Sequence, residues 1–280
     1  MKLKIRRNIG KSIIYLVLSI IGIIMVIPFV WMLSTSLKIP GTEFFFPPKW
    51  IPDPITFENY SKAFAKTDLL LNYYNSIKVA LLTVLPTVLL TSVAGYAFAK
   101  LRFKGRNILF FICIMLIMVP QEVTLVPKLL LMREFGWLDK HISIIVPHIF
   151  GATAVFALFV MRQNFLSIPD EMIESGKIDG ASHLRIFFSI IFPMAKSAVA
   201  AVVIFTFMNS WNDFIEPLVY LTSKKRFTLQ LALNMFKGAY GETEWTVWMA
   251  ACTISILPVM LVYVLAQKQF IDSLAFSGIK

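Results

Sequence analysis

Charged residues are scarce in this chain of 280 residues, at only 15% of the total, and there are only 12 glycines. Hydrophobic residues, by contrast, make up 58%, and the mean hydropathy is +0.73. A soluble domain of this size cannot bury so much apolar surface, so the composition excludes an ordinary soluble fold. The surplus apolar surface must face lipid.

Cysteine is also rare, and both examples, Cys113 and Cys252, lie inside apolar runs without C-x-x-C or metal-ligand spacing. We expect both to pack as small hydrophobic residues. The sequence contains no G-x-x-x-x-G-K-[ST] phosphate loop, no H-E-x-x-H motif and no paired nucleophile and base at membrane depth. It therefore predicts no catalytic residue, no metal site and no cofactor in this chain, and any ATP used must bind to another subunit.

The few charges are gathered in short blocks between long apolar runs, each long enough to cross a hydrocarbon core of about 30 Å. Continuous runs of this length favour helices over the alternating strands, about ten residues long, of a membrane barrel. We predict an all-α, polytopic membrane protein with a single transmembrane domain over residues 1–280 and a cytoplasmic loop at 162–196. The six predicted spans are 12–33, 79–99, 107–121, 142–161, 197–221 and 245–267.

Basic residues set the predicted orientation. The clusters at 2–11 and 100–106 flank the first three spans on one side, which the positive-inside rule assigns to the cytoplasm. Six spans then place both termini in the cytoplasm, although the cluster at 224–226 lies outside and argues weakly the other way. The net charge of +11 is concentrated at the ends of apolar runs, so we expect lipid headgroups, and not nucleic acid, to be its partner.

One span boundary and one residue leave alternatives open. The third span is short unless residues 123–127 continue it in a kinked form. His148, which follows Pro147 inside the fourth span, is either a ligand or proton relay or a donor to a carbonyl freed by the proline; the second interpretation is favoured.

The loop at 162–196 carries the clearest local pattern. Ser167 followed by Asp170 resembles a helix start, and Gly180 supplies a turn that ends this short helix. A second helix is predicted beyond it, with an apolar stripe at helical spacing formed by Leu184, Phe187, Phe188 and Ile191. This arrangement presents a short acidic helix to the cytoplasm.

The same loop contains Glu174-Ser175-Gly176, then Asp179-Gly180-Ala181, then Pro193. This pattern resembles the EAA loop of ABC importer permeases, with Ser175 and Gly176 in place of two alanines. The stretches 211–214 (WNDF) and 99–105 are similar to the carbohydrate-uptake branch, particularly the smaller permease of maltose-type systems.

The resemblance implies a function and a set of partners. The chain would be one permease of an importer for a sugar or oligosaccharide in the inner membrane of a bacterium or archaeon. Its partners would be a second permease, a cytoplasmic ATPase dimer that binds ATP and Mg²⁺, and an external solute-binding protein. The seven motif residues just named would couple the permease to the ATPase.

A second group of candidate residues lies at the outer half of the fifth span: Asn209, Trp211, Asn212, Asp213 and Glu216. Amides, carboxylates and an aromatic ring suit sugar recognition, and a carboxylate in lipid is costly, so we expect these side chains to line the outer gate of the translocation path. The alternative is that the span ends near Asn212 and the acids lie at the headgroup level.

A proton-coupled secondary transporter is the competing function, with Asp213 and Glu216 as its coupling site. It would predict an internal repeat, and the first and last three spans show no convincing similarity.

Overall fold

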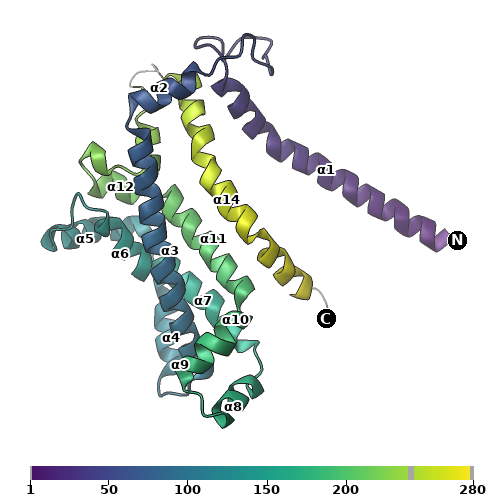
Figure 1. The fold of residues 1–280 in the computed structure, drawn as a ribbon, viewed down its shortest axis with the longest axis vertical. Coiled ribbons are helices and arrows are strands. Elements are labelled where there is room, and N and C mark those ends of the chain that lie inside the picture. The colour runs from purple at the N-terminus through teal and green to yellow at the C-terminus, as the bar shows by residue number, and fades with distance from the viewer. Residues whose placement is uncertain (1, 239–242, 278–280) are drawn as a thin grey trace. The chain divides into compact units, whose positions relative to one another are not determined.

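The computed structural model describes residues 2–238 and 243–277, in which every regular element is a helix (Figure 1). This confirms the predicted all-α fold. The chain forms two compact units, one of residues 1–67 with 233–256 and the other of residues 68–232 with 257–280, and each is considered by itself.

Four stretches of helix in the described residues are long and apolar enough to cross a membrane: Lys11–Ser36, Leu69–Lys100, Ile142–Leu166 and Trp245–Lys268. They lie in α1 (Lys2–Ser36), α3 (Leu69–Lys100), the successive helices α6 (Ile142–Phe150) and α7 (Ala152–Leu166), and α14 (Trp245–Ser277). Two bent pairs of helices bring the number of candidate spans to six if each pair is one span. The chain is therefore a polytopic helical membrane protein.

The first bent pair occupies the predicted third span. Helix α4 (Arg106–Met115) and the 3₁₀ turn η1 (Leu116–Met118) are followed by α5 (Gln121–Glu134) at an angle of 99°. Pro120 lies at the bend with extended backbone geometry, as expected for a residue that has no amide hydrogen to continue a helix. The straight part of the third span therefore ends at Met118, before the predicted end at residue 121. Residues 123–127 continue the chain in α5, which turns away from α4.

The second bent pair involves the predicted fifth span. Helix α9 (His183–Ile186), the π-helical segment η2 (Phe187–Ile191) and α10 (Phe192–Met194) meet α11 (Lys196–Asn212) at 81°. The predicted fifth span at 197–221 is not one helix. Helix α11 ends at Asn212, where the alternative interpretation placed the end of the span, and α12 (Ile215–Tyr220) begins after a two-residue break. Pro217 explains the break, since a continuous helix there would leave the carbonyl of Asp213 without a partner.

The second span is longer than predicted. Helix α3 begins at Leu69 instead of residue 79, and the polar residues Asn72, Asn75 and Ser76 of its first turns are buried in protein. The Asn75 amide donates to the carbonyls of Lys225 and Phe227, both at 3.0 Å, and the Ser76 hydroxyl accepts from the Leu229 amide at 2.7 Å. These bonds hold the segment that contains η3 (Lys224–Arg226) and the start of α13 (Leu229–Asn234).

In the unit that contains residues 1–67, the segment after α1 is ordered by a buried asparagine. Asn59, in α2 (Glu58–Lys66), donates to the carbonyls of Ser36 at 2.9 Å and Lys38 at 2.7 Å. Trp31 and Trp50 make an edge-to-face contact with ring centroids 5.1 Å apart. The polar segment between α1 and α2 is therefore a folded loop.

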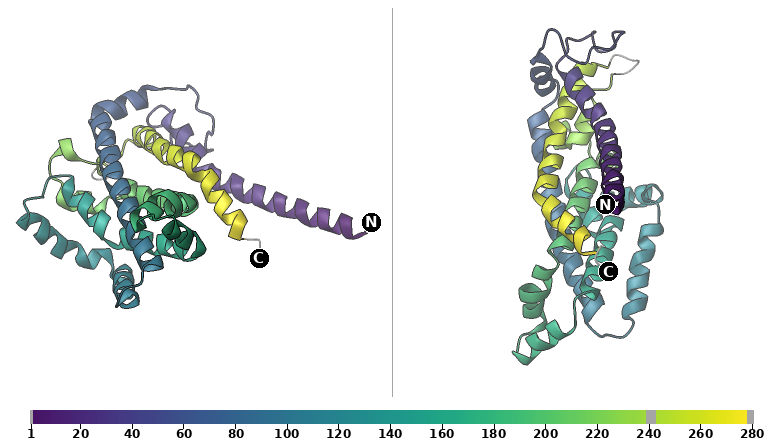
Figure 2. Two further views of the ribbon diagram at one scale, coloured as in Figure 1. Left: turned by 60° about the horizontal axis from the view of Figure 1, so that its bottom comes forward. Right: turned by 90° about the vertical axis from the view of Figure 1, so that its right-hand side faces the viewer.

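In the other unit, α3 packs along α7 and α11 (Figures 1 and 2). Gly95 allows the closest approach: a Cβ there would lie 3.0 Å from the Met161 Cβ and 3.1 Å from the Arg162 amide nitrogen. A small residue is therefore required where α3 meets α7.

Candidate coupling loop and outer polar cluster

The loop at 162–196 forms a helical hairpin at the end of α3 that carries Lys100 (Figure 1). Its first arm is α8 (Glu171–Ile178), and its second is formed by α9, η2 and α10. The predicted cap is absent, since the Ser167 hydroxyl donates to the Asn164 carbonyl and the Asp170 side chain makes no capping bond to the start of α8.

Asp170 instead pairs with Lys100, at the end of α3. The Lys100 ammonium, whose side chain is only 6% exposed, lies 2.6 Å from the Asp170 carboxylate and 2.5 Å from the Ile168 carbonyl. The hydrogen bond from Lys100, followed by its positive charge, lowers the pKa of Asp170. This contact ties the base of the hairpin to a membrane-crossing helix.

The end of α8 is closed by backbone hydrogen bonds. The Ala181 amide donates to the Gly176 carbonyl and the Gly180 amide to the Lys177 carbonyl, which together form a Schellman motif. Gly180 has a φ of +74°, the left-handed conformation that this motif requires and that glycine adopts without steric cost. The predicted turn at Gly180 is present.

Gly176 brings the two arms together. A Cβ on this buried residue would lie 3.0 Å from Ile186 Cγ1 and 3.2 Å from Ile190 Cδ1, so α8 approaches the second arm more closely than an alanine would comfortably permit. The glycine in place of an alanine therefore weakens the helix propensity of α8 but permits tight packing.

The residues of the predicted apolar stripe on the second arm divide into two pairs. Phe187 and Ile191 are buried, whereas Leu184 and Phe188 are 64% and 52% exposed. The segment Phe187–Ile191 is π-helical, and Ile186 just before it is buried as well.

The hairpin shares one apolar core with the membrane helices. Tyr96 of α3, Phe165 of α7 and Phe187 of η2 contact one another through their rings. Ile173 of α8 is buried in the same cluster, and Ala181 packs against it. A displacement of α8 would therefore be transmitted to α3 and α7 by direct packing.

The outer face of α8 is solvent-exposed. Glu174, Ser175 and Asp179 are exposed, and Ile178 beside them is 85% exposed. Pro193 is exposed as well, on α10 near the bend into α11. Among the motif residues, those with charged or hydroxyl side chains thus point outward, while Gly176 and Ala181 pack inward.

The second group of candidate residues is more dispersed than predicted. Trp211 is buried, with its ring stacked on Phe207 at 5.4 Å. The Asn209 amide donates to the Phe205 carbonyl of its own helix. Asn212 is exposed at the end of α11. The structure therefore does not bring these three side chains to one point.

Asp213 and Glu216 do come together, and they meet a lysine and a histidine that the sequence did not assign to them. Lys128 of α5 lies 2.9 Å from Glu216 Oε1. His148 of α6 lies between the two acids, with Nδ1 3.5 Å from Glu216 Oε2 and Nε2 3.7 Å from Asp213 Oδ2. The side chains of His148, Asp213 and Glu216 are only 10%, 13% and 9% exposed.

His148 Nδ1 donates to the Ile144 carbonyl at 2.9 Å, whereas the carbonyl that Pro147 frees is that of Ser143. The role of His148 therefore stays a prediction. The sequence grouped the two acids, but their pairing with Lys128 and His148 was missed. Lys128 and Glu216 are far apart in the sequence, and the available signal was that each is an isolated charge within an apolar stretch.

His148, Asp213 and Glu216 each offer an oxygen or nitrogen atom, and these atoms lie within 4.8 Å of one another, a spacing that a metal ion could use. The Lys128 ammonium, however, already supplies a positive charge to Glu216. The geometry suits a cluster that joins α5, α6 and α12.

A bundle of membrane-crossing helices, with a rigid hairpin packed into its core and exposed at its tip, defines an integral membrane transport subunit. Residues 88–275 match the family model described as the binding-protein-dependent transport system inner membrane component, and the chain belongs to this family. Such a subunit works with an ATPase, a partner permease and a solute-binding protein.

Individual relatives agree over most of the chain. It is 32% identical to the lactose transport system permease protein LacG of Rhizobium radiobacter, with 96% of this chain and 97% of the relative covered. It is 34% identical to the arabinooligosaccharides transport system permease protein AraQ of Bacillus subtilis, with 82% and 80% covered. A chain in the crystal structure of a bacterial ABC transporter for alginate import has the same fold, with a TM-score of 0.81, 24% identity, and 94% and 97% covered.

Proposed function

We propose that this chain is one of two membrane-spanning subunits of an ABC importer that takes up a sugar or oligosaccharide delivered by an external binding protein. The substrate class rests on the relatives, which are named for lactose and for arabinooligosaccharides. Because the named sugars differ, the relatives support a carbohydrate as the substrate class but no particular sugar.

The hairpin is the element through which ATP hydrolysis would drive transport. The observation that carries this proposal is that α8 is exposed on its outer face and continuous with the helix core on its inner face. We assign Glu174, Ser175, Gly176, Asp179, Gly180, Ala181 and Pro193 to coupling with the partner ATPase. ATP and Mg²⁺ would bind to that partner, and this chain would act as a transport subunit without an ATP site of its own.

The hairpin must then lie in the cytoplasm, together with both chain termini. Single cysteines placed at Ser182, next to the Gly180 turn, and at Ser61, in α2, test this orientation, since both positions are exposed. A membrane-impermeant thiol reagent added to intact cells should label Ser61→Cys and not Ser182→Cys. The opposite pattern would overturn the orientation and the coupling role.

We also propose that the break between α11 and α12 lies at the outer end of the translocation path. Asn209, Trp211, Asn212, Asp213 and Glu216 remain our candidates for this path. Because Asp213 and Glu216 are held by His148 and Lys128, their role would be to shape the break, with Asn212 as the exposed amide. Asp213→Asn and Glu216→Gln should alter the solute dependence of ATPase activity without preventing assembly; unchanged dependence in both would remove these acids from the path.

The experiment that tests the function is reconstitution of the chain with its ATPase, partner permease and binding protein in liposomes. Uptake of a carbohydrate should require ATP and all four components. Uptake by this chain alone, driven by a proton gradient, would instead support the secondary transporter, for which the buried cluster around His148 would be the coupling site.

A further inference from the structure

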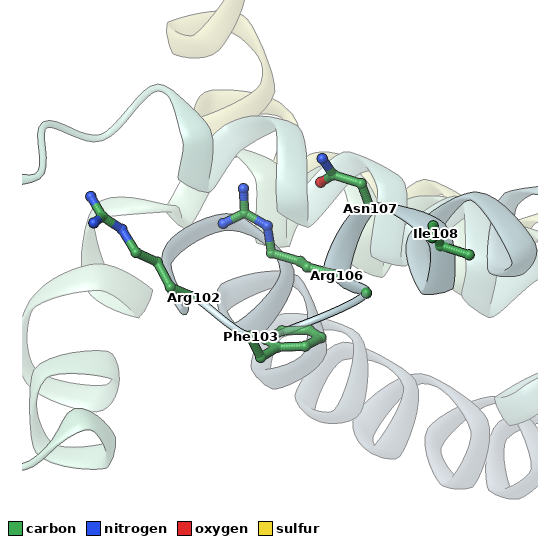
Figure 3. A pocket seen from close by; sticks show the side chains of 6 residues that line it. Arg102, Phe103, Arg106, Asn107 and Ile108 are labelled. Atoms are coloured by element: carbon green, nitrogen blue, oxygen red, sulfur yellow. The ribbon is translucent and has the colours of Figure 1, made fainter.

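A pocket of about 470 Å³ lies at the turn between α3 and α4 and is not part of either site above (Figure 3). It is lined by Arg102, Phe103, Gly105, Arg106, Asn107 and Ile108. Figure 3 shows that Arg102, Arg106 and Asn107 extend to the same side of the turn. The pocket thus presents two guanidinium groups and an amide together.

The positive charge of this pocket is not neutralised within the described part of the chain. None of the six lining residues is acidic, and neither Arg102 nor Arg106 forms an ion pair with a described residue. The Arg106 Nη1 donates to the Leu101 carbonyl, which leaves its other N–H groups available. The nearby acid, Asp170, has its own partner in Lys100, although Arg102 also contributes to lowering its pKa.

An apolar surface rises directly from the pocket. Helix α4 contains no buried residue, and Ile108, Phe111 and Ile112 are 67%, 63% and 49% exposed. In a membrane-crossing helix, such a face contacts acyl chains. A ligand that satisfies both regions must therefore have an anionic head and an apolar tail.

We propose that this pocket binds the phosphate group of an anionic phospholipid in the cytoplasmic leaflet, with the acyl chains along α4. Guanidinium groups bind phosphate through paired hydrogen bonds, which a lysine cannot reproduce. The assignment to the cytoplasmic leaflet rests on the orientation proposed above, whereas the binding itself does not.

The test uses the complete transporter in detergent, titrated with phosphatidylglycerol or phosphatidylcholine and followed by native mass spectrometry. The Arg102→Gln/Arg106→Gln variant should bind phosphatidylglycerol about thirtyfold more weakly, equivalent to about 2 kcal/mol for two cations at a lipid surface. The matched control is Lys224→Gln/Lys225→Gln, which removes two exposed positive charges from η3 and should leave this binding unchanged.

A variant with one substitution tests the proposal with less disturbance of the fold. Arg102→Gln removes no hydrogen bond of the turn and should weaken phosphatidylglycerol binding about fivefold. Equal binding of phosphatidylcholine, or equal losses in the η3 control, would overturn the proposal. Displacement of the lipid by millimolar inorganic phosphate would show a site for the free anion and overturn the assignment to lipid. None of these outcomes depends on whether the transporter carries a sugar.

Discussion

Charged residues are arranged in opposite ways in the candidate coupling hairpin and in the candidate outer polar cluster. In the hairpin, Glu174 and Asp179 are exposed, and only Lys100 at its base is buried. In the outer cluster, Glu216 is buried against Lys128 and His148. Exposed charges remain available to a partner protein, whereas buried and paired charges hold helices of the same chain together. The first region is thus suited to docking and the second to maintaining the helix arrangement.

The largest expected effect is at the outer cluster. Lys128→Met would leave Glu216 buried without its cation and should lower the free energy of unfolding by about 3 kcal/mol. This value is near the low end for buried ion pairs, because the Lys128 side chain is 25% exposed. Thermal unfolding of the purified complex measures this. Lys128→Met/Glu216→Met should recover most of the loss, and a double variant no more stable than the single one would show that the pair does not hold these helices.

The next effect is at the base of the hairpin. Lys100→Met removes hydrogen bonds to Ile168 and Asp170 and should cost about 1.5–3 kcal/mol of local stability. We expect ATPase activity to become less dependent on solute, because α8 is no longer tied to α3. Lys104→Met is the control, since Lys104 is an exposed cation of the turn that follows α3. If both variants behave alike, the tie at Lys100 has no role in coupling.

A smaller energetic effect is expected at the tip of the hairpin. Gly180→Leu places a side chain at a φ of +74° and should cost about 1–2 kcal/mol, although a Cβ there meets no atom within 4 Å. Gly136→Leu is matched, because Gly136 also has a positive φ, +62°, and open space around it. We expect transport to fall only in the Gly180 variant, measured as uptake per ATP hydrolysed. A similar fall in both would indicate general strain and not coupling.

The smallest effect concerns Asp139, between α5 and α6. Its carboxylate accepts from the Ser223 hydroxyl and from the amides of Ser223 and Thr222, and the Ser223 hydroxyl bond is the main reason that its pKa is lowered to about 2.

Because the folded pKa lies below the unfolded value of about 3.9, this stabilisation is complete above about pH 5 and is lost as the pH falls through about 2. At pH 7, Asp139→Asn should speed hydrogen exchange at the Thr222 and Ser223 amides about threefold, a modest change for a side chain 29% exposed to solvent. Unchanged exchange would show that the carboxylate does not restrain this loop.

Local patterns predicted the Gly180 turn of the hairpin but not the start of α8, where the expected cap is absent. The Gly180 turn depends on residues that are adjacent in the sequence, so its position followed from glycine chemistry alone. Hydropathy located the membrane-crossing helices for the same reason, since a span is a continuous stretch of chain. The π-helical segment at Phe187–Ile191 was not predicted, because helical spacing assumes a constant turn.

Long-range pairing could not be predicted in the same way. The ion pair of Lys128 with Glu216 depends on how α5 meets α12, which a single sequence does not specify. The early start of α3 was missed because Asn75 and Ser76 lower the hydropathy of its first turns while being buried by the segment at 225–229. Polar residues inside protein and polar residues in water look alike in a hydropathy profile.

The most direct test of the account is solvent access at Ile178, the apolar residue that is 85% exposed on α8. A variant with Cys113 and Cys252 replaced by serine and Ile178 by cysteine would be labelled with a thiol reagent in inside-out vesicles, with and without the ATPase subunit. We predict that the ATPase blocks labelling of Ile178→Cys at least tenfold, on the order expected for a docked and buried contact. Equal labelling in the presence and absence of a bound ATPase would contradict the claim that α8 is its docking site.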